Sequence, residues 1–220
     1  MSTAAEGPCR TAILVSGSGT NLQSFIDEVS AGHLPLAISL VISNRADAYG
    51  LQRAAAAGIV HRSIPHADYA DRETFDRAMA AALDDAGIEL VVLAGFMRIL
   101  SPWFVRRYEG RILNIHPALL PLYPGLDTHA RALAAGDAWH GSTVHFVTEE
   151  LDGGPRVLAG RIRVAPGDTA SSLKTRVQAV EHVIYPQAAG WYAQGRLRYR
   201  DGEAWLDGER LDEPVVIDFP

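Results

Sequence analysis

Short runs of apolar, often β-branched residues alternate with helical patterns through the first half of this 220-residue chain, and this alternation constrains its fold most. Strands and helices in such a series predict right-handed βαβ units and a parallel sheet covered by helices. Residues 89–95 are almost continuously apolar, as is typical of a strand buried on both faces. The predicted strands are residues 11–16, 36–43, 59–64, 89–95 and 111–116, and the predicted helices are residues 22–31, 48–57 with Asp47 as the cap, and 71–86.

The second half changes character, because two predicted strands follow each other with only a turn between them. These strands are residues 141–148 and 157–164, joined through Asp152-Gly153-Gly154-Pro155. The long helix that follows has an apolar stripe made of Leu173, Val177, Val180, Ile184, Ala188 and Trp191. Two later Asp-Gly pairs, at residues 201–202 and 207–208, predict hairpin turns. The expected fold class is therefore α/β, Rossmann-like and doubly wound, with a mostly parallel sheet and antiparallel C-terminal strands.

The composition is that of an ordinary globular protein, with 48% hydrophobic and 21% charged residues. Residues 1–10 lack periodicity and are predicted to be a flexible tail, so that residues 11–220 form a single domain. Cys9 is the only cysteine, which excludes an intramolecular disulfide and a cysteine-rich metal site. We expect a cytoplasmic protein without a metal.

Charge and hydropathy limit the possible partners. The formal net charge of −6 argues against nucleic-acid binding, although a small anion needs only a local pocket. No apolar run approaches the roughly 18 residues of a membrane span, and the N-terminus lacks the pattern of a secretory signal. The expected partners are small-molecule substrates, with no nucleic acid and no membrane, bound by a monomer or homodimer.

A glycine-rich loop, Ser16-Gly17-Ser18-Gly19-Thr20-Asn21, separates the first predicted strand from the first predicted helix. Such a loop is the usual anion site of an open α/β sheet, because amides at the helix N-terminus point at the ligand; a plain turn is the alternative. The NAD fingerprint is incomplete, since Leu22 replaces the third glycine and the second strand ends without an acidic residue. Arg45 could hold an NADP phosphate, which leaves a reductase open. A P-loop NTPase is excluded, because no Gly-Lys-Ser/Thr follows.

Two polar side chains interrupt the predicted strand at residues 111–116. Asn114 and His116 are two positions apart, so both face one side of the sheet, about 6.5–7 Å apart along the strand. They lie at its carboxyl end, where such sheets bind ligands. Asp152, if it lies beside His116, would stabilise the imidazolium and fix its orientation; a simple turn residue is the alternative.

An asparagine amide and an imidazolium together can stabilise the oxyanion of acyl transfer, and the imidazole can also move a proton. No enzyme nucleophile accompanies them, because Ser18 lacks the Gly-x-Ser-x-Gly elbow and Cys9 lies in the predicted tail. These residues therefore predict direct attack by a nucleophile that belongs to a substrate.

Four segments carry a resemblance to a known family. They are Gly17-x-Gly19-x-Asn21, residues 94–100 (AGFMRIL), residues 114–121 (NIHPALLP) and residues 145–154 (HFVTEELDGG). In this order they resemble the folate-dependent phosphoribosylglycinamide formyltransferase family of purine biosynthesis, and the likeness extends from about Thr11 to Leu211. The resemblance implies the formyltransferase fold and transfer of the formyl group of 10-formyltetrahydrofolate, a co-substrate, to the amine of glycinamide ribonucleotide.

The resemblance also implies roles for individual residues. Asn114, His116 and Asp152 would be catalytic, with His145 next to them. The ribonucleotide would be held by Gly19, Thr20, Asn21, Gln178 and Glu181. The folate would be held by Arg72, Met97, Arg98, Ile99, Leu100, Asn114, Thr148, Glu149, Glu150, Leu151 and Asp152. Residues 11–110 would form a nucleotide-binding half and residues 111–220 a folate-binding half.

Other families share the catalytic motif but differ outside it. A methionyl-tRNA formyltransferase would have a further C-terminal domain, and a formyltetrahydrofolate hydrolase an N-terminal regulatory domain; we expect neither here. The compact size favours the glycinamide ribonucleotide enzyme, with the hydrolase and an NADP-dependent reductase as alternatives. Leu122, Asp127 and Arg156 depart from the family pattern, the first two on the phosphate side of the site.

Overall fold

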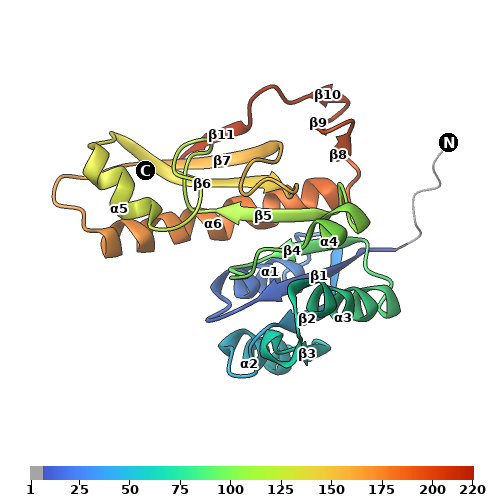
Figure 1. Cartoon of the computed structure of the whole chain (residues 1–220). Coiled ribbons are helices and arrows are strands. Elements are labelled where there is room, and N and C mark those ends of the chain that lie inside the picture. Colours follow the sequence, from blue (N-terminus) through green and yellow to red (C-terminus); the bar gives the residue numbers. More distant parts are fainter. Residues whose placement is uncertain (1–6) are drawn as a thin grey trace.

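The computed structural model describes residues 7–220 and contains one eight-stranded mixed sheet and a small three-stranded sheet (Figure 1). The order in the large sheet is β11-β7-β6-β5-β4-β1-β2-β3. Its strands are β1 (Cys9–Val15), β2 (Leu36–Ser43), β3 (His61–Ser63), β4 (Leu90–Leu93), β5 (Ile112–His116), β6 (Trp139–Phe146), β7 (Arg156–Arg163) and β11 (Val215–Asp218). The small antiparallel sheet consists of β8 (Leu197–Arg200), β9 (Glu203–Leu206) and β10 (Glu209–Arg210).

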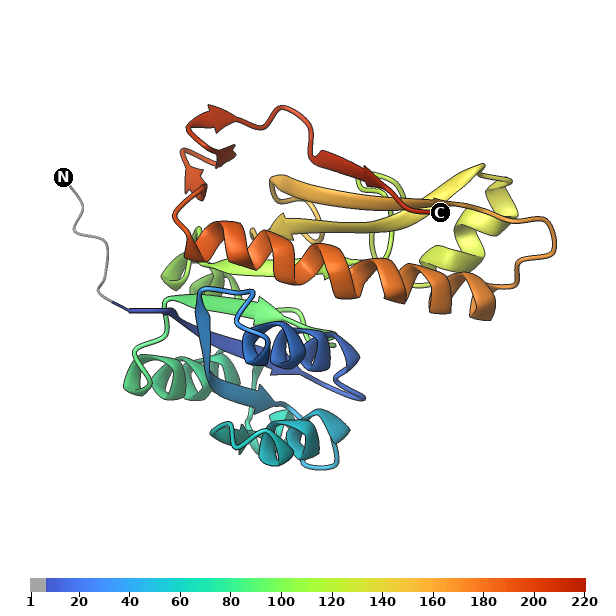
Figure 2. The same ribbon diagram turned by 180° about the vertical axis from the view of Figure 1, so that it is seen from behind.

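Strands β1 to β5 pair in parallel, whereas β6 is antiparallel to both β5 and β7. One face of the sheet, in front in Figure 2, is covered by α1 (Thr20–Ser30), α2 (Tyr49–Ala56) and α6 (Ala170–Ala193). The other face is covered by α3 (Arg72–Asp85) and α4 (Pro102–Arg107), while α5 (Thr128–Ala135) packs beside α6. The predicted α/β class, mostly parallel with antiparallel strands in the second half, is confirmed.

The position of β1 between β2 and β4 determines where a ligand can enter. The chain leaves β1 toward α1 on one face and leaves β4 toward α4 on the other. A crevice therefore opens at the carboxyl ends of these strands, which is the general ligand position in open α/β sheets.

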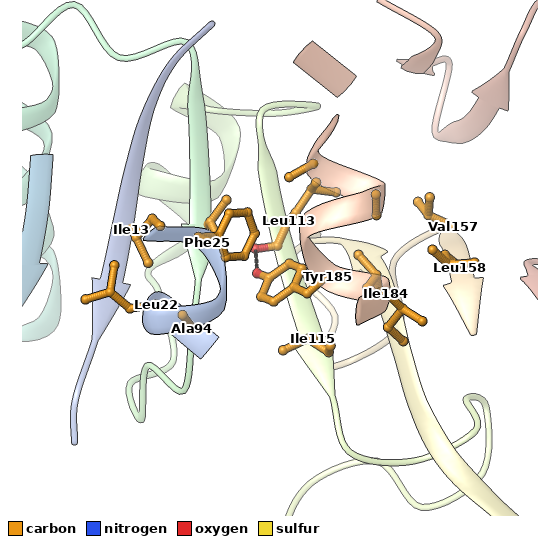
Figure 3. Close-up of a cluster of buried hydrophobic side chains, with 14 of the residues drawn as sticks. Ile13, Leu22, Phe25, Ala94, Leu113, Ile115, Val157, Leu158, Ile184 and Tyr185 are labelled. Atoms are coloured by element: carbon orange, nitrogen blue, oxygen red, sulfur yellow. Dashed lines mark hydrogen bonds between the residues drawn. The ribbon is translucent and has the colours of Figure 1, made fainter. Parts of the chain in front are cut away.

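Helix α6 is fixed to the strands of this crevice by a buried tyrosine (Figure 3). The Tyr185 hydroxyl lies 2.8 Å from the carbonyl oxygen of Leu113 in β5 and 3.1 Å from that of Leu93 in β4. Its ring packs edge-on against Phe25 of α1, with centroids 5.3 Å apart. Complete burial raises the pKa of Tyr185 well above its ordinary value, so the hydroxyl remains a donor. Helices α1 and α6 are thereby held in a fixed position against β4 and β5.

Most predicted elements are present, with differences at their ends. The Asp-Gly pairs form the two predicted hairpin turns, because both residues of each pair have positive φ: 52° and 82° at Asp201-Gly202, 53° and 88° at Asp207-Gly208. The prediction that Asp47 caps α2 is wrong: the cap position is Ala48, and the Asp47 carboxylate binds Arg45 instead.

Two α-helices and one strand, namely α4, α5 and β11, were not predicted, and neither was the short 3-10 helix His66–Asp68. The start of α4 does have a sequence signal, since Ser101 accepts a hydrogen bond from the Phe104 amide and Pro102 occupies the first turn. Within residues 7–220 no helix combines the length and apolar character needed to cross a bilayer.

Candidate active site

A cleft of about 1010 Å³ opens at the carboxyl ends of β1, β4 and β5. It is lined by the glycine loop, the segment after β4, the end of β5, the loop after β6 and one side of α6. Every residue predicted to be catalytic or ligand-binding lines this cleft except Arg72. The predicted site residues, which lie far apart in sequence, are therefore brought together at one place.

Asn114, His116 and Asp152 all line the cleft, and His145 lies between Asn114 and Asp152. Strand β5 directs the first two side chains to the same side, as the period of two predicts. Asp152 has a φ of 53°, and this left-handed turn brings its carboxylate to His116, with Oδ2 3.4 Å from Nδ1. The amide of Gly125 donates to the same oxygen at 2.9 Å. The acid is thus oriented from two sides before any ligand binds.

Both ring nitrogens of His116 face oxygen acceptors. Nε2 donates to the carbonyl of Tyr123 at 2.8 Å, while Nδ1 faces the carboxylate of Asp152. Only the doubly protonated ring donates a hydrogen bond on both sides. The surroundings therefore suit an imidazolium, which can stabilise a developing negative charge.

His145 is a second buried histidine in this centre, and it is held neutral. Burial lowers the pKa of His145 to about 4, because the charged ring would lose its hydration. Its Nδ1 donates to the carbonyl of Phe146 at 2.8 Å, so Nε2 is free to accept from the Asn114 amide at 3.1 Å. A neutral His145 thus fixes the orientation of the Asn114 side chain and leaves its second N–H available.

The glycine loop meets the helical side of the cleft. Gly19 has a φ of 68°, and a Cβ there would lie 2.7 Å from the Cα of Gly50, so this position requires glycine. A Cβ at Gly17 would meet nothing within 4 Å. Helix α1 has no side-chain cap and no acidic residue in its first turn, which leaves its N-terminal amides suited to an anion.

The polar residues predicted to hold a ribonucleotide are already paired across α1 and α6. Gln178 Nε2 donates to the Thr20 hydroxyl at 2.6 Å, and Asn21 Nδ2 donates to Glu181 at 2.9 Å. Burial raises the pKa of Glu181 above its ordinary value, partly offset by the hydrogen bonds from Asn21 and Ser142. These contacts lock the glycine loop onto the long helix.

Another part of the cleft lining is apolar. Met97, Ile99 and Leu151 line it and are 69%, 56% and 56% exposed, which marks a surface that a flat apolar ligand can cover. The amide of Met97 donates to the hydroxyl of Ser16 at 2.7 Å, so this segment is tied to the end of β1. Arg72 lies elsewhere, in a shallow hollow beside Arg77 and Pro102 at the start of α3 and α4.

Sequence reasoning missed several residues at the site. Tyr123 and Gly125 contact the predicted catalytic side chains of His116 and Asp152 through their backbones, which no side-chain pattern reveals. His129 and Lys174 also line the cleft, and the only signal for Lys174 is that it is the sole lysine.

Three residues were predicted to depart from the family pattern, namely Leu122, Asp127 and Arg156. The structure shows contacts that hold Arg156 and shows where the other two lie. Arg156 donates to the carbonyl of Leu120 at 2.9 Å and forms an ion pair with Glu213 at 2.9 Å. Asp127 lines the cleft with a φ of 57°, and Leu122 is 52% exposed.

The structure also bears on two other possibilities, a reductase and a metal site. Arg45, which could have held the phosphate of NADP in a reductase, forms an ion pair with Asp47 at 2.8 Å. Within residues 7–220, no three His, Cys, Asp or Glu residues converge closely enough to hold a metal ion.

Comparisons with known proteins agree with this geometry. The family model described as formyl transferase matches residues 9–189. The phosphoribosylglycinamide formyltransferases of Escherichia coli (strain K12) and Haemophilus influenzae are 50% and 46% identical, with 90% and 92% of this chain and 94% and 95% of theirs covered. The solved structure of the phosphoribosylglycinamide formyltransferase of Coxiella burnetii, in complex with CHES, is 48% identical with a TM-score of 0.92, covering 97% of this chain and 100% of that one.

Proposed function

The chain belongs to the formyl transferase family, and from that membership together with the cleft we infer that it is a phosphoribosylglycinamide formyltransferase of purine biosynthesis. Its donor is 10-formyltetrahydrofolate and its acceptor is the amine of N1-(5-phosphoribosyl)glycinamide. The observation that carries this assignment is the meeting of Asn114, His116 and Asp152 between an anion-binding loop and an apolar surface. A phosphorylated acceptor fits the first, and the flat rings of a folate fit the second.

In the reaction that we propose, the lone pair of the glycinamide amine attacks the formyl carbon of the folate. The carbonyl π electrons move to oxygen, where the second N–H of Asn114 and the imidazolium of His116 stabilise the negative charge. The intermediate collapses as the bond between the formyl carbon and N10 breaks. A proton passes from the attacking nitrogen to N10, directly or through His116 or water, giving the formylated ribonucleotide and tetrahydrofolate.

Asp152 acts through His116 in this proposal. Its carboxylate lies 3.4 Å from Nδ1 and stabilises the imidazolium by charge, while Gly125 prevents it from turning away. Because a substrate amine is the nucleophile, the centre needs no serine or cysteine.

We assign the phosphate of the acceptor to the loop of Gly19, Thr20 and Asn21, with Gln178 and Glu181 reaching its ribose and glycinamide parts. The folate lies on residues 97–100 and 148–152, with Arg72 toward its carboxylate end. In this proposal residues 11–220 act as one domain. The nucleotide-binding half, residues 11–110, contributes the glycine loop, and the folate-binding half, residues 111–220, contributes the catalytic centre and α6.

We further propose that the enzyme is cytoplasmic, works without a metal and is a monomer or homodimer. Turnover that is unchanged by a chelator would support the metal-free reaction, and sedimentation at micromolar concentration would decide the oligomeric state.

The test of the main proposal is a folate assay. The protein is mixed with 10-formyltetrahydrofolate and glycinamide ribonucleotide, and the absorbance of the folate is followed. We expect turnover only when both are present. Equal turnover without the ribonucleotide would indicate a hydrolase, and turnover that depends on NADPH would indicate a reductase; either outcome contradicts the proposal.

A further inference from the structure

Residues 121–127, here called the support loop, contact both members of the catalytic acid–imidazole pair. The carbonyl of Tyr123 accepts from His116 Nε2 at 2.8 Å, and the amide of Gly125 donates to Asp152 Oδ2 at 2.9 Å. These two backbone groups are two positions apart in one loop. Any displacement of the loop would therefore move or release both catalytic side chains together.

The backbone of the support loop has an unfavourable conformation at Tyr123. Tyr123 has a φ of 55°, a left-handed conformation that residues with a Cβ rarely adopt. Such a conformation persists only where neighbouring contacts hold it. The contacts made by the Tyr123 side chain are therefore expected to determine where its carbonyl lies.

Contacts from α5 and the segment after it hold the loop. The Tyr123 hydroxyl donates to Asp137 Oδ2 at 2.6 Å, and this hydrogen bond raises the pKa of Tyr123, so the proton stays on the tyrosine. Arg131 donates to the carbonyl of Pro124 at 2.7 Å, and its guanidinium lies 5.2 Å from the centre of the Tyr123 ring. The loop is thus held through the side chain of Tyr123 and through the backbone carbonyl of Pro124.

Helix α5 is itself anchored to the sheet. His129 of α5 lies with Nδ1 3.0 Å from Nε2 of His140 in β6. Burial lowers the pKa of His140 to about 4 and also lowers that of His129, so the pair is neutral, one ring donating and the other accepting. A continuous set of contacts therefore connects β6, α5, Asp137, Tyr123 and His116.

We propose that Tyr123 and Asp137 are positioning residues of the transferase reaction: their hydrogen bond holds the support loop so that His116 and Asp152 stay in catalytic orientation. The inference rests on the proposed function for its kinetic consequence. Its structural consequence, the position of the His116 ring, does not depend on that function. Neither residue would touch a substrate.

The key variant is Tyr123→Phe, which removes the hydroxyl and keeps the ring. We expect kcat to fall about tenfold, in the range that one hydrogen bond and a small displacement of catalytic groups can cause. Both KM values should stay within about twofold, because the ends of the cleft are untouched. Asp137→Ala should have the same effect, and the double variant should be no slower than either single one, because both changes remove one contact.

Two variants serve as controls. Asp137→Asn keeps an oxygen that accepts from Tyr123, so its kcat should return to within about twofold of the parent. Tyr199→Phe removes a hydroxyl that binds Glu109 at 3.2 Å, far from the cleft, and should leave kcat unchanged. Melting temperatures measured on all variants separate a loss of folded protein from a loss of positioning.

An NMR measurement keeps the inference separate from the proposed function. The ring ¹⁵N signals of His116 should shift in Tyr123→Phe and Asp137→Ala but not in Tyr199→Phe. Unchanged signals in the first two variants would overturn the inference, as would a kcat within twofold of the parent. A parent enzyme that shows no ribonucleotide-dependent turnover would instead contradict the proposed function, and the shifted signals would still support the positioning contact.

Discussion

The glycine-loop part and the apolar part of the cleft, here called its two ends, differ in how far they are assembled before a ligand arrives. At the glycine-loop end, Gln178 already binds Thr20 and Glu181 already binds Asn21, so the loop is fixed to α6 by side-chain hydrogen bonds. At the apolar end, which we propose as the folate site and call the folate end, three large apolar side chains are more than half exposed. The first end is preorganised by polar contacts, and the second can gain stability only when a ligand covers it.

This difference teaches how one cleft can recognise two unlike substrates. A charged phosphate needs donors with a fixed geometry, because amides that must reorganise lose much of their advantage. A folate ring needs apolar area, which tolerates small displacements. The proposed catalytic residues form a third region of the cleft, and substitutions in the three regions should give three kinds of kinetic result.

The largest effect is expected at the centre, from Asn114→Ala. Loss of one preoriented oxyanion donor lowers kcat by about 10²–10³, equivalent to roughly 2.7–4 kcal/mol. Because Asn114 is only one of many predicted folate contacts and none of the predicted ribonucleotide contacts, equilibrium binding of both substrates should be retained. Steady-state kinetics and binding titrations check this, and a kcat within tenfold of the parent would remove Asn114 from the mechanism.

The next prediction compares two glycines of the loop, Gly19, which the fold requires, and Gly17, which is expected to matter only for ligand binding. Gly19→Ala combines a left-handed φ with a contact of 2.7 Å to Gly50, so it should lower the melting temperature by several degrees. Gly17→Ala places its methyl group in open space in the cleft and should leave the melting temperature unchanged. Instead it should raise KM for the ribonucleotide about tenfold without affecting KM for the folate. A rise in both KM values with Gly17→Ala would mean that the loop does not belong to one substrate.

At the folate end, Met97→Ser and Leu151→Ser should each raise KM for the folate about tenfold. Covering such a side chain fully contributes roughly 1.5–3 kcal/mol, and a tenfold change corresponds to about 1.4 kcal/mol. The melting temperature of the free enzyme should not fall, because both side chains are exposed without a ligand. A decrease in stability would show that this end is preassembled like the other one.

The sequence predicts those parts of the site that depend on local periodicity. Asn114 and His116 could be placed on one side of β5 because side chains alternate along any strand, and the glycine loop could be placed at the start of a helix. The same holds for the two Asp-Gly hairpins, whose residues suit positive φ.

Contacts made by backbone groups could not be predicted. The carbonyl of Tyr123 and the amide of Gly125 reach His116 and Asp152 only because α5 holds the support loop, and α5 was itself missed. The Asp47 cap failed for a related reason, since a nearby Arg45 competes for its carboxylate. Tertiary partners decide such cases, and a single sequence does not show them.

The smallest effect is expected from the charge of Glu181, and it tests what holds the glycine-loop end together. Burial raises the pKa of Glu181 above its ordinary value of 4.5. A carboxyl group whose pKa is higher in the folded state stabilises the fold fully below its unfolded pKa, and this contribution is lost as pH rises through the folded value. Glu181→Gln keeps the shape and can still accept from Asn21, but it cannot ionise.

We therefore expect the melting temperature of the parent, minus that of Glu181→Gln, to decrease as the pH rises from below 4.5 toward neutrality. Taking the difference cancels the titration of all other groups, which both proteins share. The variant should melt at nearly the same temperature as the parent at low pH, where Glu181 is protonated and both proteins have a neutral side chain there. A difference that stays constant with pH would show that Glu181 ionises as easily in the folded as in the unfolded chain. In that case the hydrogen bonds from Asn21 and Ser142 fully offset the burial of the charge, and charge-assisted hydrogen bonds to an ionised Glu181 hold the glycine-loop end.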